Sequence, residues 1–285
     1  MPPSTPPNLD SLGAWLALLT RSSYLLFVAV LLAWFGRLAW FDRETDGAVS
    51  FNYHPLFMGL AFVVLMPEAL LAYADLEERR GFGHAAAKKM HAWAHIAASV
   101  CILLGLIFVF ANHSAKGIPA LYSAHSWIGL TAAMCTFLQA IVGCVAYALP
   151  TLFGVGGESR ARLLPAHRFA GAATLALGAA ACVAGFVEKQ SFTKCAPDAS
   201  DKRCAALSLV NVLVLLVAST ATFGAALVGI TYGVLSASWE PGRDGTFWGL
   251  EEFKTNIPIL LQTVAAKAAG KDPSDWDDEW DDGRD

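Results

Sequence analysis

The chain has 285 residues, of which 55% are hydrophobic and only 15% are charged, with a formal net charge of −4. A soluble globular protein carries about 25% charged residues, so this composition excludes an ordinary soluble domain. No basic stripe is present that would favour a nucleic-acid partner.

Six apolar runs are long enough to cross a lipid membrane, because a helix needs roughly 20 mostly apolar residues to span the hydrocarbon core. We therefore predict an all-α fold, a six-transmembrane-helix bundle that occupies residues 23–235. Short loops make consecutive helices antiparallel neighbours. The runs lie at about 23–41, 54–74, 90–111, 123–148, 165–188 and 207–235.

The two ends of the chain flank this bundle. Residues 1–22 have no basic residue before Arg21, which makes a poor signal peptide, so the first run is expected to stay in the mature protein. Residues 236–285 end in "DPSDWDDEWDDGRD", an acidic run typical of a solvated, disordered tail. Lys and Arg counts tie in the loops, and the tails tip the count to nine against six, with both termini cytosolic.

Two cysteines, Cys195 and Cys204, share the loop between the last two runs. We expect a disulfide between them if that loop faces an oxidising compartment, and two unpaired thiols otherwise. The other cysteines fall inside predicted spans, where they act as small apolar residues.

Four histidines stand near the starts of four consecutive spans: His54, His91, His125 and His167. An ionisable residue inside a membrane span is costly and is by default a functional candidate. Because successive helices alternate in direction, His54 and His125 are expected at similar depth near one surface. His91 and His167 are expected together near the opposite surface.

Two imidazoles that face each other across a bundle can ligate a haem iron from both sides. Such a haem has no open iron position, which suits electron transfer. Two haems, one near each surface, can carry an electron across a core about 30 Å thick. The alternative is a set of hydrogen-bonded boundary histidines. Zinc is less favoured, because neither pair has carboxylate or thiolate company.

At these histidines the sequence resembles the cytochrome b561 family, the ascorbate-dependent transmembrane oxidoreductases. The resemblance implies that the inner four helices form a haem-binding core for two haem b groups. It implies His54 with His125 for the iron of the non-cytosolic haem, and His91 with His167 for that of the cytosolic one. His95, one turn after His91, is the rival ligand. The matching segments are "FNYHPLFMGLAF", "KKMHAWAH", "FANH", "LYSAHSW" and "LPAHRFAG".

The resemblance also implies the substrates. Ascorbate is the cytosolic electron donor, and an anionic donor suits a basic pocket formed by Lys88, Lys89 and Arg160. For Lys89 an ordinary positive-inside charge is the alternative. Many relatives carry an arginine directly after the tyrosine that ends span two, where this chain has Ala74. His84, in the polar stretch "GFGHAAAKK", is predicted to be solvated.

On the non-cytosolic face the family passes its electron to monodehydroascorbate or a ferric chelate. The resemblance implies that Asn112, His113 and Tyr122 receive this acceptor. For Tyr122 an interfacial aromatic anchor is the alternative. The host membrane is expected to be an endomembrane, a vesicle, the vacuole or lysosome, or the plasma membrane, and the family often forms homodimers. Two other functions stay open: the membrane anchor of a larger quinone-linked dehydrogenase, and a cofactor-free six-helix transporter.

Overall fold

The computed structural model describes residues 7–37, 51–192 and 202–231. Throughout these ranges the regular structure is helical, with no strand, and six helices are long and apolar enough to cross a membrane. The predicted all-α, six-span fold is therefore confirmed. These spans are Ser11–Phe35, Tyr53–Glu77, His84–Lys116, Ala124–Ala148, Gly157–Ser191 and Leu209–Gly229.

The first span differs most from its prediction. It begins at Ser11 rather than at 23, so the predicted boundary of the N-terminal segment at residue 22 falls inside the helix. The reason is that Arg21 breaks the apolar pattern without ending the helix. Cys195 and the acidic tail at 236–285 lie outside the described residues, so the disulfide and the tail stay predictions.

The chain divides into two compact units. The first comprises the chain up to residue 136 together with residues 174–238, and the second comprises residues 137–173 together with 239–285.

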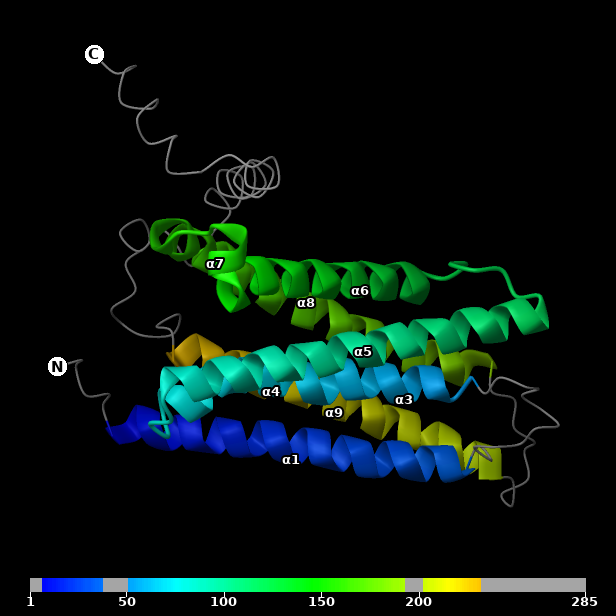
Figure 1. The fold of residues 1–285 in the computed structure, drawn as a ribbon. Coiled ribbons are helices and arrows are strands. Elements are labelled where there is room, and N and C mark those ends of the chain that lie inside the picture. The colour runs from blue at the N-terminus through cyan, green and yellow to red at the C-terminus, as the bar shows by residue number, and fades with distance from the viewer. Residues whose placement is uncertain (1–6, 38–50, 193–201, 232–285) are drawn as a thin grey trace, which may run out of the picture. The chain divides into compact units, whose positions relative to one another are not determined.

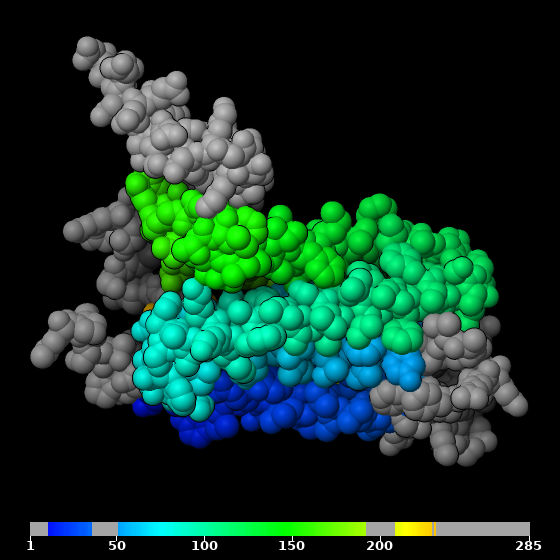
Figure 2. All heavy atoms as spheres, in the orientation of Figure 1, coloured from blue at the N-terminus to red at the C-terminus, as the bar shows by residue number. Residues whose placement is uncertain are grey.

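In the first unit, α1 packs along α9, and α3 and α4 pack against α5 (Figure 1). With all atoms drawn, the side chains of α1, α3 and α5 fill the space between their ribbons (Figure 2). The helices of this unit are α1 (Pro7–Arg37), α3 (Tyr53–Gly59), α4 (Met66–Leu71), α5 (His84–Lys116), α9 (Lys202–Thr231) and the first part of α6 (Ala124–Val142) and last part of α8 (Gly157–Phe192).

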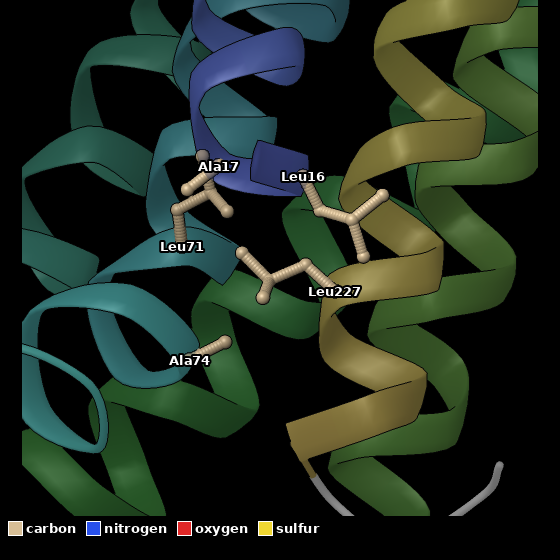
Figure 3. Packing of buried hydrophobic residues seen from close by; sticks show 5 residues of the cluster. All are labelled: Leu16, Ala17, Leu71, Ala74 and Leu227. Atoms are coloured by element: carbon tan, nitrogen blue, oxygen red, sulfur yellow. The ribbon is translucent and has the colours of Figure 1, made fainter. Parts of the chain in front are cut away.

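One hydrophobic cluster joins three helices of the first unit (Figure 3). Leu16 and Ala17 come from α1, Leu71 and Ala74 from the second span, and Leu227 from α9. All five side chains are almost completely buried. The cluster therefore fixes the second span against the two outer helices.

The second span is a continuous helix whose winding alternates between α and π. Two π-helical segments, η1 (Leu60–Leu65) and η2 (Ala72–Glu77), flank the short α-helix α4. Pro67 follows η1 directly inside this continuous helix, and a proline cannot donate the backbone hydrogen bond of a helix interior, which is a usual cause of local distortion. Wide π turns occur often at functional sites, and this span carries one of the four candidate histidines.

The second unit contains the end of the fourth span and the start of the fifth. The π-helical segment η3 (Gly143–Ala148) leads into α7 (Pro150–Phe153), which ends at Gly154 with a φ of 70°. Ala146, Val155 and Leu163 form its hydrophobic cluster.

Candidate functional site

A cavity of about 520 Å³ lies in the first unit, and both His54 and His125 line it. Its volume is within the 300–1,000 Å³ of typical cofactor and ligand sites. The two imidazole ring centres are 6.1 Å apart, with the rings inclined by 79°. Sequence spacing alone placed these residues at similar depth, and the structure brings their rings together.

Each of the two rings is held by a backbone carbonyl of another helix. Nδ1 of His54 lies 3.0 Å from the oxygen of Gly105, and Nδ1 of His125 lies 2.9 Å from that of Ala181. A carbonyl only accepts hydrogen bonds, so Nδ1 carries the proton and Nε2 keeps its lone pair. This is the tautomer in which a histidine binds a metal through Nε2.

The spacing of the rings fits one metal ion between them. If one metal ion were held by both imidazoles, two bonds of ~2.0–2.1 Å plus the distance from each nitrogen to its ring centre would add up to about 6.4 Å, close to the observed 6.1 Å. Two imidazoles supply two ligands, so this pair would suit an iron that brings its other ligands in a porphyrin ring.

Glycines make room for this arrangement. A Cβ atom at Gly185 would lie 2.6 Å from Cε1 of His125, and one at Gly105 would lie 3.1 Å from Cε of Met58. The first distance is too short for any side chain, so His125 occupies its position only because residue 185 is glycine. The backbone of α8 thus cradles one face of the candidate ligand.

Hydrogen bonds at the start of α6 fix the position of the turn that carries His125. The N–H of Ser126 donates to Oγ of Ser123 at 3.3 Å, the usual contact of a helix N-cap. The same Ser123 hydroxyl donates to Oε2 of Glu188 on α8 at 2.9 Å. The cap therefore ties the first turn of α6, which carries His125, to the neighbouring helix.

The three predicted acceptor residues line the same cavity as these histidines. Asn112 is buried, and the His113 and Tyr122 ring centres are 6.0 Å apart. Burial and then a hydrogen bond to Glu188 raise the pKa of the Tyr122 hydroxyl above its ordinary value. Lys116 and Glu188 also line the cavity, so its rim carries charges of both signs.

Residues 53–193 match the family model described as eukaryotic cytochrome b561. The chain is 34% identical over 223 residues to the transmembrane ascorbate-dependent reductase CYB561 of Bos taurus, covering 76% of this chain and 80% of that relative. The chain belongs to the cytochrome b561 family. It is therefore an oxidoreductase of the membrane, as the sequence predicted.

Other relatives of this cytochrome b561 protein come from distant organisms. The plasma membrane ascorbate-dependent reductase CYBRD1 of Xenopus laevis is 31% identical over 191 residues, 65% of each chain. The ascorbate-specific transmembrane electron transporter 1 of Zea mays is 32% identical over 186 residues, 65% of this chain and 74% of that one. A second family model, described as photosynthesis affected mutant 68, matches residues 202–268.

His91, the predicted cytosolic ligand in this cytochrome b561 chain, repeats the hydrogen-bond pattern of His54 and His125. Its Nδ1 lies 2.8 Å from the carbonyl oxygen of Ala69. The His95 ring centre is 4.6 Å away, one turn along α5. Lys88 is half-buried and Lys89 is exposed on the same helix.

His167 and Arg160 belong to the second unit. The His167 ring centre lies 5.3 Å from that of Tyr147, and the Tyr147 hydroxyl donates to the backbone oxygen of Arg160 at 3.2 Å. The pairing of His91 with His167, and the basic pocket that would include Arg160, join residues of both units and stay predictions.

The sequence did not predict a charged network in the C-terminal half of the second span. Arg21 on α1 contacts Glu68 at 2.8 Å and Asp75 at 2.6 Å. Arg79 and Arg80 also pair with Asp75, whose side chain is fully buried. The two acidic residues at 68 and 75, inside an otherwise apolar span, could have indicated this network, because buried charges in a membrane require partners of opposite charge.

Proposed function

We propose that this protein carries electrons across its membrane, from cytosolic ascorbate to monodehydroascorbate or a ferric chelate on the other side. Two haem b groups would be held by His54 with His125 and by His91 with His167. The observation that carries the proposal is the pair of imidazoles 6.1 Å apart, both with Nδ1 bound to a backbone carbonyl, in a cavity of cofactor size.

Haem supplies a one-electron couple whose potential the protein tunes through its ligands and surroundings. The chain itself supplies the fixed position of the ligands. The carbonyls of Gly105 and Ala181 hold both Nδ1 protons, so neither ring can turn its Nε2 away from the cavity without losing a hydrogen bond. Trp34 and Phe186, both buried, make part of the cavity wall apolar.

The rim of the outer cavity suits a small acceptor that takes up an electron and a proton. Asn112, His113 and Tyr122 offer hydrogen-bonding groups, and Lys116 offers a positive charge for an anion. Monodehydroascorbate and negatively charged ferric chelates are both anions that accept one electron, and monodehydroascorbate also takes up the proton. On the cytosolic side, Lys88, Lys89 and Arg160 are proposed to attract ascorbate.

The names of the relatives support ascorbate as the donor. The relatives from Bos taurus, Xenopus laevis and Zea mays are each named for ascorbate. We propose both termini on the cytosolic face and residues 236–285 as an acidic tail. A homodimer in an endomembrane or the plasma membrane is consistent with the proposal.

Purified protein in proteoliposomes tests the proposal. With ascorbate enclosed and ferricyanide outside, we expect a visible spectrum of reduced b-type haem and loss of the external oxidant, both dependent on the protein. A protein without a haem spectrum would overturn the proposal in favour of a cofactor-free transporter. Reduction by a quinol but not by ascorbate would indicate the membrane anchor of a dehydrogenase.

A further inference from the structure

A histidine–carboxylate pair lies where the second and third spans meet. His84 is the first residue of α5, and Glu77 is the last residue of η2. Nδ1 of His84 lies 2.8 Å and 3.0 Å from the two carboxylate oxygens of Glu77. Both residues belong to the first unit. His84 is thus oriented by a partner, whereas the sequence predicted only a solvated side chain.

The carboxylate fixes which nitrogen of His84 can act as a base. A carboxylate accepts hydrogen bonds, so Nδ1 of His84 carries the proton that points at Glu77. Nε2, on the opposite side of the ring, then has the lone pair. The side chain of His84 is 70% exposed, so this nitrogen can reach a small molecule from solution. A carboxylate that orients a histidine in this way is the usual arrangement of a general base.

Tyr73 connects this pair to the predicted cytosolic ligand. Its ring centre is 5.9 Å from that of His84 and 5.1 Å from that of His91. Lys88 lies four residues after His84, so both side chains project from the same face of α5. A donor that is attracted by Lys88 would therefore meet the base and the predicted electron acceptor together.

We propose that His84, oriented by Glu77, is the base that accepts the proton of ascorbate when the donor gives up its electron. The inference rests on the proposed function, because ascorbate must be the donor. In this step one enediol O–H bond of the ascorbate monoanion breaks and its proton goes to Nε2 of His84. One electron goes to the oxidised cofactor of the protein, and the ascorbyl radical anion leaves. His84 then returns its proton to water.

Rapid-mixing measurements on the purified holoprotein test this role. Ascorbate is compared with hexaammineruthenium(II), which gives one electron and no proton. In His84→Gln we expect reduction by ascorbate to slow about 100-fold, the usual contribution of a general base, with reduction by ruthenium unchanged. In Glu77→Gln we expect a loss of about tenfold, since only orientation is weakened. Glu78→Gln, the neighbouring exposed glutamate, is the matched control and should match the unaltered protein.

A labelling experiment gives a readout besides reduction. Diethyl pyrocarbonate acylates accessible neutral imidazole nitrogen, and peptide mass spectrometry reports the modification at His84. We expect modification at this residue in the resting protein and protection by ascorbate. Protection should weaken in the variant Lys88→Gln, which retains the base but loses the charge that attracts the donor.

Three outcomes would overturn the inference. Unchanged reduction of His84→Gln by ascorbate would mean that the proton goes elsewhere. Equal slowing with both donors would mean that His84 only supports the structure. Failure of ascorbate to reduce the unaltered protein, which ruthenium still reduces, would overturn the proposed function itself and with it the role of His84.

Discussion

The two halves of the second span differ in what lies beside them: a cavity beside one half and a network of ion pairs beside the other. In the N-terminal half, His54 lines a cavity and is held by one neutral hydrogen bond to the backbone of α5. In the C-terminal half, Glu68 and Asp75 form ion pairs with arginine side chains. One half is kept open and the other is filled.

The difference shows how a helix in lipid can hold both a cofactor and a rigid frame. Fully charged groups in a membrane need partners at contact distance, and the ion pairs of Arg21 with Glu68 and Asp75 fix α1 to the second span. Beside the N-terminal half, Gly185 leaves space for the His125 ring, and backbone carbonyls hold both imidazoles at the wall of the cavity. Changes in the N-terminal half should therefore alter cofactor content, and changes in the C-terminal half should alter stability.

The largest effect is expected at Gly185, where no side chain fits beside the His125 ring. In Gly185→Val the new side chain would displace the His125 ring, since even a Cβ atom would lie 2.6 Å from it. We expect the variant to lose the outer haem, so that haem per polypeptide falls by half in the pyridine haemochrome assay. Gly224→Ala, on α9, where an added Cβ atom would lie at an ordinary 3.7 Å from its nearest neighbour, is the control and should keep full haem content.

The next effect concerns the filled half. Asp75→Asn removes the carboxylate that three arginines share, and breaking a buried ion pair typically costs about 3–5 kcal/mol. We expect a large drop in the free energy of unfolding in detergent, with the outer haem still bound in the folded fraction. Arg162→Gln disrupts an exposed pair with Glu158 and should leave stability unchanged. Equal losses in the two variants would contradict the contrast between buried and exposed pairs.

The smallest effect lies at the rim of the cavity. Glu188 raises the pKa of Tyr122 by accepting its hydrogen bond and by its negative charge, in addition to the effect of burial. A raised pKa favours the protonated hydroxyl, so this contribution to stability is complete below the ordinary tyrosine pKa of about 10 and is lost as pH rises through the folded value. In Glu188→Gln the Tyr122 pKa should fall toward its ordinary value. Subtracting the ultraviolet titration of Tyr122→Phe from that of a protein that retains Tyr122 isolates this one hydroxyl. If the titration of Tyr122 is the same with and without Glu188→Gln, Glu188 does not act on it.

Much of the fold was predictable because lipid imposes a simple pattern. Apolar runs of sufficient length marked all six spans, and alternation of helix direction put His54 and His125 at one depth. The start of the first span was missed because Arg21 resembled the end of a polar tail. Its partners Glu68 and Asp75 are far away in sequence, and an ion pair between helices has no local signature.

The sequence pointed to the histidines of the candidate site, but not to the groups that hold them in position. The motifs around His54 and His125 identified the rings, whereas the carbonyls of Gly105 and Ala181 are backbone groups that any sequence contains. Glu188 was missed for a related reason. It carries no motif, and its role depends on α8 bringing it beside Ser123 and Tyr122.

Haem stoichiometry in His125→Ala tests the central claim most directly. The unaltered protein should bind two haem b groups per polypeptide. The variant should bind one, because the imidazole of His54 alone would not retain the haem that both histidines hold. His113→Ala, at the rim of the same cavity, should keep both. Two haems in His125→Ala, or none in the unaltered protein, would contradict the assignment of His54 and His125 as a pair of iron ligands.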